Sequence, residues 1–368
     1  MEDFTTLQVV WFVLISVLWI GYFILEGFDF GVGILFKGLG RNERERRAIL
    51  HTIGPVWDGN EVWLIVAGGA TFAAFPEWYA TLFSGFYLAL FAILVALIVR
   101  AVGFELWGKR DGARWRNGWE WAIALGSAVP ALLWGVAWAN IVDGTPIDSD
   151  GEFVGSFFDL LRPYTVLGGL ATLALFFTHG ALFLEMKTTG ELRERAARVA
   201  ARSAPVAVIF PAAFLVWSLL ELESLDVGGL LFSIVAVAAL LFAAATVKSR
   251  PVRAFTGTAI AIASMFTALF IELFPHTMIS SLDPAFSMTL NQSASTEYTL
   301  TVMTVVAALL LPVTLLYQAW TYWVFRHRVG PEDFGEVKTP LDLLDEKKRK
   351  AEDVDRGSIG SEPAAGSE

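Results

Sequence analysis

Nine long apolar stretches are the feature of this sequence that most constrains its fold. A helix needs about 20 mostly apolar residues to cross the roughly 30 Å hydrocarbon core of a membrane. Hydrophobic residues fill 55% of the 368 positions, and the strict alternation of a transmembrane barrel is absent. The pattern predicts an all-α, polytopic membrane protein with nine transmembrane helices. The predicted spans are residues 7–35, 53–75, 79–101, 118–139, 163–185, 203–221, 227–247, 255–272 and 298–325.

The distribution of positive charge predicts how these spans are oriented. Of the 27 Lys and Arg residues, all except Arg162 fall after the first, third, fifth, seventh or ninth predicted span or, in the case of Arg100, at the end of the third. Because basic loops stay in the cytoplasm, the N-terminus is expected outside and the C-terminus in the cytoplasm. Residues 1–325 are expected to form one nine-helix membrane domain. Residues 326–368 are polar and poor in large apolar side chains, which predicts a disordered cytoplasmic tail.

Net charge and cysteine content exclude several classes of function. The formal charge of −10 arises largely from acidic outer loops, so it reports topology, and no nucleic-acid partner is expected. The sequence contains no cysteine, which excludes disulfides, thiolate-bound iron–sulfur clusters and covalently attached c-type haem.

Two acidic pairs in consecutive spans are the candidate site. Glu26 and Asp29 lie near the end of the first span, and Asp58 and Glu61 lie near the start of the second. The members of each pair are three residues apart, so they share a helix face. Charged groups inside a membrane are costly and mark functional sites. Both pairs are expected in the cytoplasmic half of the membrane, where four carboxylates could form a proton path.

A purely structural interpretation of these acids stays open. Asp58 and Glu61 follow Pro55, where acidic side chains stabilise the start of a helix. Glu61 could pair with Arg100, and the first pair could bind the basic loop that follows it.

Histidine content argues against haem or metal ligation by this chain. Of the four histidines only His179 lies within a predicted span, whereas a haem held between helices needs two axial ligands. A hydrogen-bonded structural role is favoured for His179, and no metal-binding motif is present. The abundant aromatic residues fit interfacial belts and do not locate a quinone site.

Several strings in the first 140 residues resemble subunit II of the cytochrome bd quinol oxidases. The closest matches are residues 27–33 (GFDFGVG), 38–42 (GLGRN), 57–64 (WDGNEVWL), 83–87 (FSGFY), 100–105 (RAVGFE) and 114–121 (RWRNGWEW). The later half fits by helix count and topology. The resemblance implies a multi-pass protein of a bacterial or archaeal cell membrane.

In that family, subunit II pairs with a homologous subunit I that carries two b haems, haem d and the quinol site. The resemblance implies that this chain helps deliver cytoplasmic protons for the reduction of oxygen to water. Asp29 and Asp58 would be proton-path residues. Glu26 stands where the family usually has an acid, and Glu61 where some members have Gln. A bound quinone or lipid is implied as well, and a small additional subunit is left open.

Two other functions are weighed against this one. A proton-coupled secondary transporter also uses many helices and intramembrane acids, but it needs access from both sides and a site near the midplane. A scaffold that merely supports a haem subunit predicts that Asp29 and Asp58 can become Asn with little loss of turnover.

Overall fold

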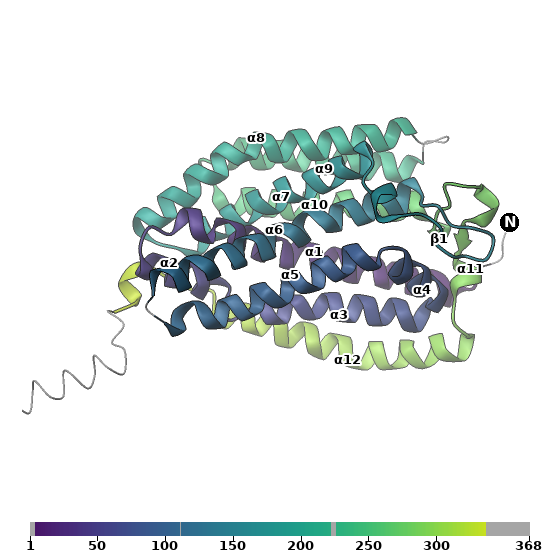
Figure 1. Cartoon of the computed structure of the whole chain (residues 1–368), viewed down its shortest axis with the longest axis horizontal. Coiled ribbons are helices and arrows are strands. Elements are labelled where there is room, and N and C mark those ends of the chain that lie inside the picture. The colour runs from purple at the N-terminus through teal and green to yellow at the C-terminus, as the bar shows by residue number, and fades with distance from the viewer. Residues whose placement is uncertain (1–3, 111, 222–225, 336–368) are drawn as a thin grey trace, which may run out of the picture.

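The computed structural model describes residues 4–110, 112–221 and 226–335, and nearly all of its regular structure is helical (Figure 1). The α-helices are α1 (Thr6–Leu39), α2 (Glu43–Ile53), α3 (Trp57–Ala74), α4 (Pro76–Gly85), α5 (Tyr87–Leu106), α6 (Ala113–Asp143), α7 (Pro163–Lys187), α8 (Gly190–Glu221), α9 (Val227–Thr246), α10 (Pro251–Leu273), α11 (Leu290–Ser293) and α12 (Glu297–Val324). The short elements are η1 (Trp107–Lys109), η2 (Phe157–Leu160), η3 (Pro284–Phe286), η4 (Pro331–Asp333), β1 (His276–Met278) and β2 (Met288–Thr289).

Eight helices of the described chain are long and apolar enough to cross a membrane: α1, α5, α6, α7, α8, α9, α10 and α12. The expected second span corresponds to α3, which has 18 residues and lies alongside α12 (Figure 1). Polar residues in its first two turns make α3 less apolar than the others. The start of α1 and the end of α12 lie at opposite ends of the bundle.

Helix α1 forms the centre of the bundle, with α3, α6, α7 and α10 packed around it. Two glycines of α1 permit this close packing. A Cβ atom on Gly31 would lie 2.1 Å from the backbone oxygen of Phe176 in α7. A Cβ atom on Gly21 would lie 2.1 Å from the indole ring of Trp63 in α3. Neither contact leaves room for a larger residue, so both helices approach α1 at glycine.

The third predicted span, residues 79–101, is divided between two helices. Phe86 separates α4 from α5 and has a non-helical backbone (φ −98°, ψ 14°). The aromatic ring of Phe153, from the loop after α6, packs against Gly85 at this point. The sequence pattern did not predict this break, because the apolar run continues through it.

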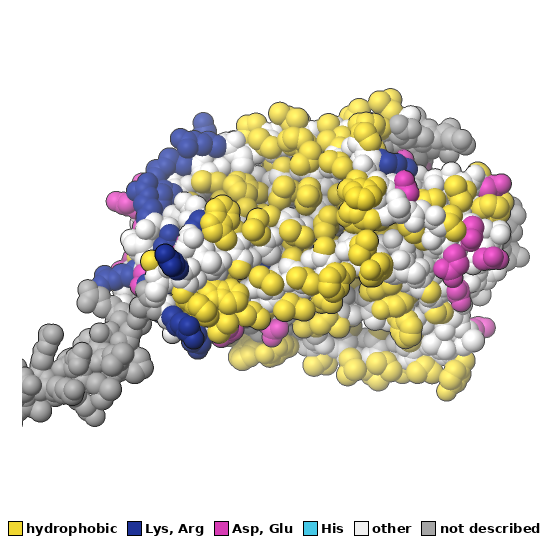
Figure 2. Space-filling view, viewed as in Figure 1, with side chains coloured by type: hydrophobic (Ala, Val, Ile, Leu, Met, Phe, Trp, Pro, Cys, Tyr) yellow, Lys and Arg dark blue, Asp and Glu magenta, His cyan; other side chains and the backbone are white. Residues whose placement is uncertain are grey.

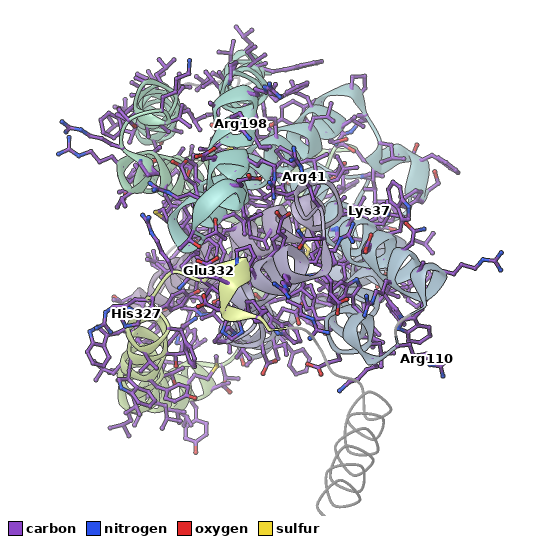
Figure 3. All side chains as sticks on the ribbon, turned by 90° about the vertical axis from the view of Figure 1, so that its left-hand side faces the viewer. Lys37, Arg41, Arg110, Arg198, His327 and Glu332 are labelled. Atoms are coloured by element: carbon purple, nitrogen blue, oxygen red, sulfur yellow. The ribbon has the colours of Figure 1, made fainter. Side chains whose placement is uncertain are left out.

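One end of the molecule is basic and the other acidic (Figure 2). The side chains of Lys37, Arg41, Arg110, Arg198 and His327 come from different segments and lie at the basic end (Figure 3). This separation agrees with the charge pattern from which the topology was predicted. The small β1–β2 hairpin and α11 lie at the opposite end, where the loops are acidic (Figure 1).

Two features of the basic end were not predicted. Residues expected to form a loop after the first span instead form the amphipathic helix α2, which is capped by the Asn42 side chain. Residues 326–335 lie against the bundle. The backbone N–H of Val329 donates to Lys187 O at 2.8 Å, and Thr189 donates to Glu332 at 2.7 Å. The tail prediction for residues 336–368 concerns a segment outside the described residues.

Candidate functional site

A fully buried arginine lies at the centre of the candidate site. Arg100 of α5 forms an ion pair with Glu26 of α1, and its Nη1 lies 3.5 Å from Glu61 Oε1 of α3. The rings of Phe30 and Phe104 flank the guanidinium group, with centroids 5.0 and 5.2 Å from its carbon. The pairing of Glu61 with Arg100, which the structural interpretation left open, is present in the structure. The charge pattern alone assigns Arg100 to the basic loop, whereas it lies inside α5, whose last residue is Leu106.

Asp29 lies one helical turn beyond Glu26 and is held by a different residue. Its Oδ2 accepts a hydrogen bond of 2.6 Å from Asn60 Nδ2 of α3. Asp29, Asn60 and Glu26 are all fully buried. Asn60 lies within the acidic string of the second span, but the sequence offered no reason to single out an amide between two carboxylates.

This cluster holds more acidic than basic groups. Three carboxyl groups, those of Glu26, Asp29 and Glu61, surround the single guanidinium of Arg100. Within the described residues, Glu26 Oε2 and Asp29 Oδ1 are buried and have no hydrogen-bond partner. One cation cannot compensate three carboxylates, two of them fully buried, so the arrangement is suited to holding and exchanging a proton.

Asp58, the fourth predicted residue, does not join this cluster. It is the second residue of α3 and is exposed. The Glu61 side chain is 20% exposed and that of Glu26 is fully buried, so exposure falls stepwise from Asp58 inward. The position of Asp58 in the first turn of α3 also fits the structural interpretation, since acids there favour helix formation. Its place in a proton path stays a prediction.

A cleft of about 390 Å³ opens at the basic end, close to the cluster. Its lining includes His51 of α2, Trp57 of α3, and Phe104 and Glu105 of α5. The rings of Trp57 and Phe104 contact each other, with centroids 5.4 Å apart. Phe104 therefore lines the cleft and also flanks Arg100.

The basic residues at this end pair with other acids. Glu120 of α6, which is buried, binds Lys37 and Arg46, both at 3.3 Å. Glu43 of α2 binds Arg47 and Arg116. Partial burial raises the pKa of Glu43, but the hydrogen bonds and charges of these two arginines outweigh it and lower the pKa below its ordinary value. The alternative in which Glu26 and Asp29 bind the basic loop after the first span is therefore wrong, because Glu26 binds Arg100 and Asp29 binds Asn60.

His179 of α7 has both ring nitrogens occupied. Nδ1 lies 2.6 Å from Thr258 Oγ1 of α10, and Nε2 lies 3.3 Å from the backbone oxygen of Ile24. Its ring stacks on Phe255, with centroids 4.2 Å apart. These contacts link α1, α7 and α10 and do not fit an axial haem ligand. The described residues also contain no group of three or more His, Cys, Asp or Glu side chains placed to hold a metal ion.

Membrane-length helices around buried ionisable side chains define a polytopic membrane protein with a candidate functional site inside the bundle. Comparison with known proteins identifies its family. Residues 7–325 match the family model described as cytochrome bd terminal oxidase subunit II. The chain belongs to this family, and it is a component of a terminal oxidase complex.

Relatives from two bacteria match almost the whole chain. It is 39% identical over 332 residues to cytochrome bd ubiquinol oxidase subunit 2 of Bacillus subtilis, which covers 89% of this chain and 98% of the relative. It is 37% identical over 370 residues to cytochrome bd-I ubiquinol oxidase subunit 2 of Escherichia coli, covering 90% and 98%. These relatives support a multi-pass protein of a bacterial membrane and give no support to the archaeal alternative.

The fold is similar to that of a solved structure. A chain of the bd oxidase from Geobacillus thermodenitrificans superimposes with a TM-score of 0.70. The match covers 87% of this chain and 99% of that chain, at 19% identity. At this level of identity the likeness concerns the fold alone.

Proposed function

We propose that this chain is the subunit of a quinol:oxygen oxidoreductase that carries cytoplasmic protons to a haem-bearing subunit I, which contains two b haems and haem d. Membership of the family supports the complex. The observation that supports the proton role is the cluster of Glu26, Asp29 and Glu61 around Arg100, placed toward the basic end of the bundle. Reduction of oxygen consumes protons, and drawing them from one side of the membrane separates charge.

The proposed route begins at the basic end and follows decreasing exposure. The cleft lined by His51 and Glu105 admits water from the cytoplasm. Asp58, which is exposed, and Glu61, which is half-buried, take up protons at the start of α3. Glu26 and Asp29 hold them inside the bundle, where Arg100 keeps the carboxyl groups together. From there protons pass to the partner, so this chain itself needs no haem.

The exposed stripe of α3 supports a partner on this face. Asp58 shares one helix face with Val62, Ile65 and Phe72, which are all exposed. Ionisable side chains of membrane helices avoid lipid and face protein or water. We therefore propose that subunit I covers the face formed by α3 and α12. In the described structure only 6% of the most apolar stretch of α12 is buried.

The proposal includes a membrane topology. Adding α3 to the eight membrane-length helices of the described residues gives nine proposed spans. An odd number of spans puts the two termini on opposite sides, and the basic end of the bundle supports a cytoplasmic C-terminus and an outer N-terminus. The additional small subunit and the bound quinone implied by the resemblance stay predictions, and no residue is assigned to them.

A proton-coupled transporter is less well supported. Such a protein needs a site near the midplane with access from both sides, whereas the cluster lies toward the basic end. In the acidic half, Glu272 lies near Asp226, and no Lys or Arg of the described residues acts on it as Arg100 acts on the cluster.

The test is turnover of the purified complex. The tagged chain is extracted gently, and its subunit composition and its reduced-minus-oxidised optical spectrum are recorded. A second membrane subunit with b and d haem bands is expected. Asp29→Asn and Asp58→Asn are each expected to lower oxygen consumption at least tenfold with the haems retained. Asp150→Asn, in an exposed loop at the acidic end, is the matched control. Wild-type turnover in both variants of an intact complex would reject the proton role and favour a scaffold.

A further inference from the structure

A line of side-chain hydrogen bonds runs from α3 through α12 to Asp29. Trp63 Nε1 donates to Gln318 Oε1 at 2.8 Å. Gln318 Nε2 donates to Asn60 Oδ1 at 3.3 Å, and Tyr322 OH donates to the same oxygen at 2.7 Å. Asn60 Nδ2 in turn donates to Asp29 Oδ2. Trp63 and Asn60 both belong to the string at residues 57–64, and the proton route gives neither of them a role.

The chemistry of the first residue fixes the direction of the whole line. The indole N–H of Trp63 can only donate, so Gln318 must present its carbonyl oxygen to it and its amino group to Asn60. Asn60 must then present its oxygen to Gln318 and Tyr322, and its amino group to Asp29. If either amide were reversed, it would bring two donors or two acceptors together. Each amide orientation is therefore determined by its neighbour.

We propose that this line of hydrogen bonds from Trp63 to Asp29 (the relay) positions the Asp29 carboxyl group and determines which of its oxygens exchanges protons. Oδ2 is held as an acceptor by Asn60, whereas Oδ1 is buried and has no hydrogen-bond partner within the described residues. The proton is therefore taken up and released at Oδ1. Trp63, Gln318, Asn60 and Tyr322 are positioning residues that act through Asp29. This inference rests on the proton role proposed for Asp29.

The relay also links Asp29 to the position of α12. Gln318 and Tyr322 lie one helical turn apart on α12, and both donate to Asn60. The far end of the relay is fixed because the Trp63 ring lies against Gly21 of α1. Since most of α12 is exposed on the proposed partner face, docking of the partner and orientation of Asp29 are coupled through these bonds.

The experiment uses the intact oxidase complex with the single changes Trp63→Phe and Tyr322→Phe. The first removes the indole donor and keeps an aromatic ring, and the second removes one hydroxyl. The infrared difference band of Asp29 is assigned by its loss in Asp29→Asn. We expect both changes to shift this band and to lower turnover about fivefold each, the equivalent of one neutral hydrogen bond. Trp121→Phe, an exposed tryptophan of α6 outside the proposed partner face, is the matched control and is expected to change neither.

The outcomes separate the relay from the proton role. An unshifted Asp29 band in Tyr322→Phe, in an assembled complex with normal haem content, overturns the relay. An unshifted band in Trp63→Phe overturns it as well. If Asp29→Asn keeps full turnover, the proton role of Asp29 fails, but the band shift still decides whether the relay orients Asp29. If Trp63→Phe fails to assemble, Tyr322→Phe decides between the two outcomes.

Discussion

Removing the buried guanidinium of Arg100 is expected to destabilise the protein strongly. Arg100 Nη1 and Glu61 Oε1 are 3.5 Å apart, and at this distance unit charges attract by about 5 kcal/mol at an effective dielectric constant of about 20, before desolvation is subtracted. Arg100→Met removes this attraction but leaves Glu26 buried without its partner. Breaking one side of a buried ion pair costs about 3–5 kcal/mol. We therefore expect the free energy of unfolding to fall by about that amount.

A second variant distinguishes an uncompensated charge from lost packing. In the double variant Arg100→Met with Glu26→Leu, no charged partner is left fully buried at this contact. Replacing a buried pair with apolar residues is often neutral, so we expect most of the lost stability to return. The assay is denaturing-detergent titration of the purified complex, followed by near-ultraviolet circular dichroism. The reasoning is refuted if the single variant loses less than about 1 kcal/mol, or if the double variant is less stable than the single one.

Two further predictions concern the ends of the bundle. Arg162, the single Lys or Arg residue at the acidic end within the described chain, donates to Gly144 O at 2.7 Å and ties α6 to α7. Arg162→Met should therefore lower the free energy of unfolding by about 1–2 kcal/mol and speed amide exchange in residues 144–162. Unchanged exchange there contradicts this role. Because Arg47 and Arg116 hold the pKa of Glu43 below its ordinary value near 4.5, its ion pairs stabilise α2 above that pH and are lost as the pH falls through the lowered pKa. Amide exchange across α2 should therefore rise in acid relative to Glu43→Gln, and parallel pH profiles of the two proteins would rule this out.

The sequence predicted the features that depend on hydropathy and local spacing. Membrane-length helices follow from long apolar runs, and the three-residue spacing of Glu26 and Asp29 places both on one face of α1. Pairing of Glu61 with Arg100 was part of the structural alternative drawn from the sequence, and the structure contains this ion pair. The proton role of the acids stays a prediction, since static geometry does not test it.

Features that depend on tertiary contacts could not be predicted. Arg100 lies near the end of the third predicted span, but the charge pattern grouped it with the basic loop that follows; three carboxyl groups from α1 and α3 act on it inside the bundle. Gln318 and Tyr322 lie more than 250 residues from Asn60 along the chain, and no local pattern brings them to it. The break at Phe86 lies beside Phe153, which comes from the loop after α6.

The structural and functional interpretations of the acids explain different residues. The ion pairs of Arg100 account for Glu26 and Glu61, and the N-terminal turn of α3 accounts for Asp58. Neither explains Asp29, which is fully buried, faces a neutral amide and adds a third carboxyl group beside one cation. A scaffold gains nothing from this acid, because Asn at the same position could hydrogen-bond Asn60 without placing a charge in the membrane. The cost of keeping Asp29 is therefore the strongest structural argument for the proton exchange proposed at this position.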